Sequence, residues 1–105
     1  MGQYTQKMQA VVPPAGQIEV GDELVYVGKN NTCYLSKADG SHLGIEIKGG
    51  VSRLIAGEYG FTEGPWTPQM AMMVLSSLAR QAGLEGEVQQ VEGSISTIYR
   101  VRVTR

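Results

Sequence analysis

The stretch Thr67–Gly83, TPQMAMMVLSSLARQAG, is the most informative part of this chain because it predicts one long helix. Thr67 can cap the free backbone N–H groups, Pro68 suits the first helical position, and Gly83 can end the helix. At about 100° per residue, one face of this helix gathers its small and apolar residues and predicts the core side: Ala71, Val74, Leu75, Leu78, Ala79 and Ala82. Met70 and Met73 fall on the opposite side. Two methionine side chains on the solvent-facing side of an amphipathic helix indicate a contact surface.

The composition indicates one globular domain. The chain has 105 residues, of which 42% are hydrophobic and 18% are charged, a balance that argues against disorder. A net charge of −1 shows no basic excess, so nucleic acid is not an expected partner. Cys33 is the only cysteine, which excludes an intrachain disulfide and fits a reducing, cytoplasmic location. No apolar run approaches the ~20 residues that span a bilayer, so no membrane is expected as a partner.

Short apolar segments separated by turn residues predict an antiparallel sheet around this helix. Strands are predicted at residues 23–27, 32–37, 42–48 and 51–56 before the helix, and at 85–92 and 96–104 after it. The predicted fold class is α+β, with a meander of three or four strands, a C-terminal hairpin and one main helix. The alternative is a small open β-barrel plugged by the helix. Residues 1–16 are predicted to form an N-terminal arm or edge strand, and residues 17–105 a single domain.

The two hairpin turns predict how the strands line up. With Asn30-Asn31 and Asp39-Gly40 as turn tips, Val27 would face Tyr34, and Tyr34 would face Ile45. One face, the predicted core side, then holds Val25, Val27, Tyr34, Leu43, Ile45 and Ile47. The other face holds Leu24, Tyr26, Cys33, Leu35, His42 and Glu46. The apolar end of this second face would need a cover from the N-terminal arm, from residues 57–66 or from another chain.

The C-terminal part of the chain shows one resemblance to a known family. Residues 77–84, SLARQAGL, lead through a predicted hairpin to residues 98–103, IYRVRV. This pattern resembles half of a SPOR-type peptidoglycan-binding unit, in which a helix ending in Ala-Gly precedes a hairpin with a Tyr-Arg-Val-like strand. The resemblance covers under a third of the chain and implies a helix packed on a hairpin, with no function carried over.

Catalytic and metal-binding motifs are absent from the sequence. Cys33, Asp39 and His42 are the only grouping that suggests nucleophilic catalysis. The predicted pairing puts Cys33 and His42 on one face but two pairs apart, which favours a buried structural cysteine and a surface histidine. The chain has no HxxxH, CxxC or EF-hand spacing, and Gly57–Gly64 lacks the order of a phosphate-binding loop. We therefore predict no catalytic residue, metal site or cofactor, and no enzymatic activity.

A binding protein is the predicted class of function. The predicted interaction surface combines exposed apolar residues of the helix and the sheet: Met70, Met73, Trp66, Leu24, Tyr26 and Leu35. This surface predicts a small protein-binding domain with a regulatory or inhibitory role that self-associates as a homodimer. Stand-alone domains of this kind include phage and mobile-element proteins. A slight rotation of the helix, or a cover from the N-terminal arm, would instead bury both methionines as ordinary core.

Two alternatives use other residues. The loop at residues 57–66 carries Tyr59, Phe61 and Trp66 between glycines, and it predicts a small-ligand or nucleotide-binding module. In the competing interpretation these rings pack against the core where the chain crosses from sheet to helix. A minimal enzyme that uses Cys33 and His42 is the third hypothesis, and the reactivity of the thiol tests it.

Overall fold

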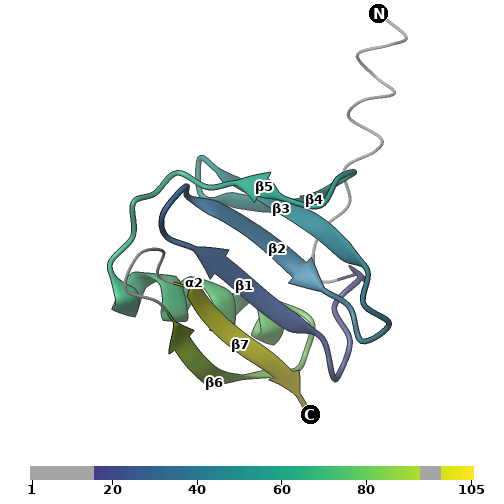
Figure 1. Ribbon diagram of the computed structural model, residues 1–105. Helices are drawn as coiled ribbons and strands as arrows, with labels where there is room; N and C mark the ends of the chain where they lie inside the picture. Colours follow the sequence, from purple (N-terminus) through teal and green to yellow (C-terminus); the bar gives the residue numbers. More distant parts are fainter. Residues whose placement is uncertain (1–15, 93–97) are drawn as a thin grey trace, which may run out of the picture.

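One helix and a seven-stranded antiparallel sheet form the part of the chain that the structure describes (Figure 1). The computed structural model describes residues 16–92 and 98–105. The strands are β1 (Glu23–Val27), β2 (Thr32–Ser36), β3 (His42–Lys48), β4 (Val51–Ile55), β5 (Gly60–Phe61), β6 (Glu85–Glu92) and β7 (Ile98–Thr104), and the helix is α2 (Pro68–Gln81). The strand order is β4-β3-β2-β1-β7-β6, with β5 paired to β2. The α+β prediction is confirmed.

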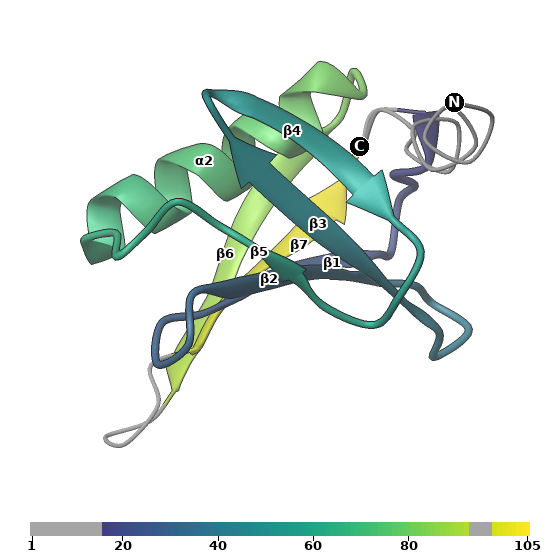
Figure 2. The same ribbon diagram turned by 90° about the horizontal axis from the view of Figure 1, so that it is seen from above.

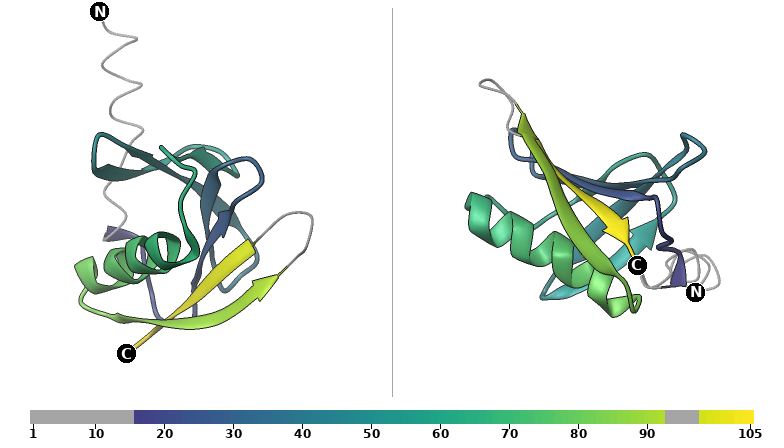
Figure 3. Two further views of the ribbon diagram at one scale, coloured as in Figure 1. Left: turned by 90° about the vertical axis from the view of Figure 1, so that its left-hand side faces the viewer. Right: turned by 90° about the horizontal axis from the view of Figure 1, so that it is seen from below.

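The sheet is open, so the alternative of a barrel is wrong. Within the described ranges, β4 and β6 stand at the two ends of the strand order and pair with no further strand. In the left view of Figure 3, which looks along the helix, the sheet curves partly around α2. Apart from Gly16, the predicted N-terminal arm lies outside the described residues.

Helix α2 begins and ends where the local sequence signals predict. The Thr67 hydroxyl accepts a hydrogen bond from Met70 N at 3.2 Å, Pro68 occupies the first turn, and Gly83 follows the helix with a φ of 77°. The predicted core face is confirmed, because Ala71, Leu75, Leu78 and Ala79 are buried. No helix in the described part of the chain is long and apolar enough to cross a membrane.

The predicted strand register is wrong at both hairpins, with different consequences. Tyr34 pairs with Val25 instead of Val27, a shift of two residues that leaves the faces of β1 and β2 unchanged. Tyr34 also pairs with Gly44 instead of Ile45, and this shift of one residue turns β3 over relative to β1 and β2. Leu43, Ile45 and Ile47 therefore share the core side with the face of Leu24, Tyr26 and Leu35, and the predicted core side is wrong for Val25, Val27 and Tyr34.

The cause of the one-residue shift is a turn longer than the two residues predicted. The Asp39 carboxylate accepts hydrogen bonds from both the backbone N–H and the hydroxyl of Ser41. Lys37 N donates to Ser41 O at 2.8 Å, so residues 37–41 all belong to the loop. The predicted Asp-Gly hairpin is therefore replaced by a wider loop.

The face of the sheet turned towards α2, called the inner face here, carries the core. Its apolar side chains are Leu24, Tyr26, Cys33, Leu35, Leu43, Ile45, Ile47, Leu54, Tyr99, Val101 and Val103. The helix packs against β6, β7 and β1 and covers this face from one side (Figure 2). Leu24, Tyr26 and Leu35 are buried by this chain itself, so the prediction of an exposed apolar face at these residues is wrong.

Two glycines allow β3 to leave the sheet. β3 pairs with β2 only up to Gly44, and β5 takes its place beside Thr32 and Cys33. A Cβ atom on Gly44 would lie 2.6 Å from the carbonyl carbon of Tyr59, and one on Gly60 would overlap the backbone of Ile45. Only glycine permits so close a crossing of two backbones. Beyond the crossing, the β3–β4 hairpin rises from the sheet over α2 (Figure 2).

A buried ion pair fixes the segment that precedes β1. The Lys37 ammonium lies 2.6 Å from the Asp22 carboxylate, which is almost fully buried, and 3.0 Å from that of Glu19. Lys37 also donates to the carbonyl of Gln17 at 2.7 Å. Partial desolvation lowers the pKa of Lys37, but the hydrogen bonds and charges of the two carboxylates outweigh it and raise the pKa overall. The chain from residue 17 onwards is thereby held in place.

Candidate binding groove

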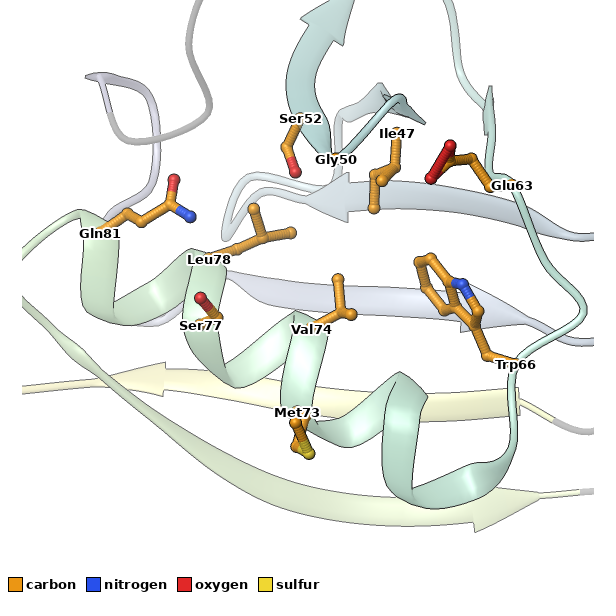
Figure 4. A pocket seen from close by; sticks show the side chains of 10 residues that line it. All are labelled: Ile47, Gly50, Ser52, Glu63, Trp66, Met73, Val74, Ser77, Leu78 and Gln81. Carbon is orange, nitrogen blue, oxygen red and sulfur yellow. The ribbon is translucent and has the colours of Figure 1, made fainter.

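A groove of about 350 Å³ lies between α2 and the tip of the β3–β4 hairpin (Figure 4). Its apolar lining comes from the helix, from β3 and from the loop before the helix: Ile47, Trp66, Met73, Val74 and Leu78. Its polar lining comes from the hairpin, the same loop and the far end of the helix: Gly50, Ser52, Glu63, Ser77 and Gln81. We call this feature the α2–β4 groove.

The tip of the β3–β4 hairpin forms one wall of the groove. The loop at residues 62–66, which closes one end of the groove, holds this tip in place. Gly49 and Gly50 both have positive φ values, 61° and 76°, which is the signature of a type I′ turn. The Glu63 carboxylate accepts a hydrogen bond from Gly49 N at 2.6 Å. This bond ties residues 62–66 to the hairpin across the groove wall.

The opposite end of the same loop is fixed to the core. The Trp66 ring packs on Tyr26 with a centroid distance of 4.8 Å, and Trp66 N donates to the Tyr26 hydroxyl at 3.4 Å. The Tyr26 hydroxyl donates to the Asn31 side-chain oxygen at 2.6 Å. Burial raises the pKa of Tyr26, so the phenol keeps the proton that it donates. A Cβ atom on Gly64 would overlap the Asn31 side chain, so this contact requires glycine.

Strand β4 offers a free edge above the groove. After a type I′ turn the flanking residues Lys48 and Val51 form a hydrogen-bonded pair, and such pairs alternate along an antiparallel ladder. The backbone groups of Ser52 and Leu54 therefore point away from β3. Within residues 16–92 and 98–105, no strand pairs with that side of β4. Of these two residues Ser52 lines the groove and Leu54 is buried, so the groove combines apolar walls with the strand edge at Ser52.

The helix part of the predicted interaction surface is found at this groove. Met73 lines it with 67% of its surface exposed, and Trp66 closes one end. Met70 is also exposed but does not line the groove. The facing wall, built from Ile47 and Ser52, was not predicted as a site. Only the Gly49-Gly50 pair marked the hairpin tip in the sequence, and nothing local showed that it would reach α2.

The three aromatic residues predicted as a ligand site lie in three places. Tyr59 is on the outer face of the sheet, with its ring 5.1 Å from Tyr34. Phe61 is exposed and lines a second hollow of about 390 Å³, which shares Ile47 with the α2–β4 groove. Trp66 faces the first groove and Tyr26. The rings therefore do not converge on one ligand position.

The structure separates the residues of the nucleophile hypothesis. Cys33 lies buried on the inner face, and desolvation raises the pKa of its thiol to about 12. His42 lies on the outer face, with its ring 4.8 Å from Tyr34. The prediction that both share one face is wrong because the one-residue shift turns β3 over. In the described residues, no group of three His, Cys, Asp or Glu side chains is placed to hold a metal ion.

The helix–hairpin packing implied by the SPOR-like resemblance is present, since α2 packs against β6 and β7. This arrangement of a helix on a hairpin occurs in many α+β folds. No protein-family model, no curated protein and no solved structure matches this chain.

Proposed function

We propose that this chain is a non-enzymatic protein-binding domain whose α2–β4 groove accepts an extended segment of another protein. The observation that carries the proposal is the juxtaposition of the free edge of β4 with the apolar groove beneath it. A peptide that adds to a sheet edge gains main-chain hydrogen bonds, while pockets beside the edge select alternate side chains. The groove supplies such pockets through Ile47, Val74 and Leu78.

The lining defines the chemistry of the segment. Successive residues of an added strand point to opposite faces, so only every second side chain would enter the groove. Those side chains would be apolar and of moderate size, because they meet the side chains of Met73, Val74 and Leu78. Glu63 is the only charged residue of the lining, and it favours a basic residue at its end of the segment.

The biological consequence of such binding is regulatory. A domain that captures a segment of a partner without changing it covalently would inhibit or regulate that partner by occupying the segment. Capture of a segment from a second copy would give the self-association that the exposed apolar residues predict. Size-exclusion chromatography with light scattering, over a range of concentrations, measures that part of the proposal.

Two methionines of α2 provide a matched test of the groove. We would select 12-residue peptides by display against the full chain and measure their binding by fluorescence anisotropy. Met73→Glu places a charge in the groove and is expected to weaken binding at least about tenfold, the effect of roughly 1.4 kcal/mol. Met70→Glu places the same charge on the same helix outside the groove and is expected to change binding less than about twofold.

Two outcomes would contradict the proposal. Equal weakening by both substitutions would indicate general adhesion to exposed apolar surface instead of binding in the groove. Failure to enrich any peptide, with both variants and the original chain folded by circular dichroism, would remove the groove as a peptide site.

A further inference from the structure

The described chain begins close to one end of the α2–β4 groove. The segment that starts at residue 16, purple in Figures 1 to 3, lies near the C-terminal end of α2 in all these views. Gln81, the last residue of that helix, lines the groove at this end (Figure 4). Ile18 belongs to the same core cluster as Leu78 and Ala79, and Lys37 holds the carbonyl of Gln17. The described chain therefore begins at this end of the groove.

The segment that precedes Gly16 has the length that the groove requires. Helix α2 has 14 residues, which at about 1.5 Å per residue gives roughly 20 Å along its axis. Six residues of extended chain cover the same distance, at about 3.3 Å per residue. Residues 4–12 exceed this length, and residues 13–15 remain to connect them to Gly16.

The chemistry of the segment also matches the lining. An extended segment would present Tyr4, Met8, Ala10 and Val12 on one side and the polar residues Thr5, Lys7 and Gln9 on the other. Residues 1–15 contain no acidic residue, so no negative charge of this segment would meet the Glu63 carboxylate in the groove lining. Pro13-Pro14 cannot donate to a strand ladder and would end the paired segment before residue 13.

We infer that residues 4–12 of the same chain occupy the α2–β4 groove, with Met8, Ala10 and Val12 directed towards α2. This inference rests on the proposed function and names its first occupant. A tether that begins at the groove gives the segment a high effective concentration there. Another protein must displace this segment. Its apparent affinity is therefore its intrinsic affinity multiplied by the fraction of chains whose groove is free.

Adjacent substitutions in the full chain test the inference. Met8→Asp puts a charge on the side that faces the groove, whereas Gln9→Asp puts the same charge on the opposite side. Trp66 is the only tryptophan and lines the groove, so its fluorescence reports occupation. Met8→Asp is expected to increase acrylamide quenching of Trp66 and to tighten the binding of display-selected peptides about fivefold, as release of a competitor requires. Gln9→Asp is expected to change neither quantity.

The outcomes separate the inference from the proposed function. If selected peptides bind Met8→Asp, Gln9→Asp and the original chain equally, the groove binds peptides and the inference about residues 4–12 is overturned. If no peptide binds any of the three chains and Trp66 quenching is the same in all, both the inference and the proposed function are overturned. If the difference between Met8→Asp and Gln9→Asp appears only at high protein concentration, the segment comes from a second copy and the same-chain inference is overturned.

Discussion

The two edge strands of the sheet, β6 and β4, meet helix α2 in different ways. β6 packs directly against the helix, and a bulge between Val88 and Gln90 interrupts its ladder. It also carries exposed acidic residues at Glu85 and Glu87. Bulges and charges are the usual means by which proteins discourage further strand pairing at an edge. β4 is short and has a regular ladder, and the groove separates it from α2.

The fold therefore protects the β6 edge of the sheet and leaves the β4 edge open for contact. The protected half consists of β1, β7 and β6 with the helix laid across them. The open half arises because β3 leaves the sheet at its crossing with β5 and carries β4 away from the helix. The following experiments address the strand between these halves, the crossing that separates them, and then their two edges.

The largest expected effect is on the reactivity of the thiol on β2, between the two halves. Because burial raises the pKa of Cys33 to about 12, its thiolate fraction at pH 8 should be roughly a thousandfold below that of an exposed thiol. Alkylation by iodoacetamide, followed by mass spectrometry, should therefore be slow in the native protein and fast in guanidinium. A native rate within tenfold of the denatured rate would show that the core opens at β2, and it would return the nucleophile hypothesis to consideration.

The second-largest expected effect is on the free energy of unfolding, at the crossing of β3 and β5 that creates the open edge. Gly60→Ala would force a methyl group into the backbone of Ile45 and should lower the free energy of unfolding by about 3 kcal/mol. Gly16→Ala is the matched control, because its Cβ atom would meet nothing within 4 Å and should cost less than about 0.5 kcal/mol. Urea unfolding measures both values. Equal costs would mean that β3 leaves the sheet for a reason other than the close passage of two glycines.

Local signals in the sequence predicted the helix and all the described strands except β5, which lies in the segment predicted as a loop. The capping threonine, the proline in the first turn and the terminal glycine all act within a few residues, so the bounds of α2 could be derived without tertiary information. The register of β3 against β2 depended on one turn, in which the Asp39 carboxylate accepts hydrogen bonds from Ser41. Because of a difference of one residue in that turn, β3 meets the other faces of β1 and β2 than predicted. Leu43, Ile45 and Ile47 are core as predicted, but Val25, Val27 and Tyr34 lie on the outer face, and Cys33 and His42 lie on opposite sides.

The groove was predicted only in part, for a related reason. Exposure of Met73 followed from helical periodicity, which is a local property. The facing wall depends on Gly44 and Gly60, which are distant in sequence and act only where their backbones cross. No periodic pattern marks such a crossing. Tyr26 and Leu35 were predicted to lie on an uncovered face because the predicted register put the polar side of β3 beside them. In the structure, β3 and α2 bury both residues.

The smallest expected effects compare the two edges directly through two exposed valines. Val51 begins β4 and Val88 lies on β6, with 52% and 46% of their surfaces exposed. Either residue changed to Lys should alter the free energy of unfolding by less than about 0.5 kcal/mol.

Val51→Lys should weaken the binding of a display-selected peptide about threefold, because an added strand would pair beside this residue. Val88→Lys should leave binding unchanged in the same anisotropy titration. Since both variants add one positive charge to an edge strand, equal binding losses would trace to charge alone, and the distinction between a protected and an open edge would then be wrong.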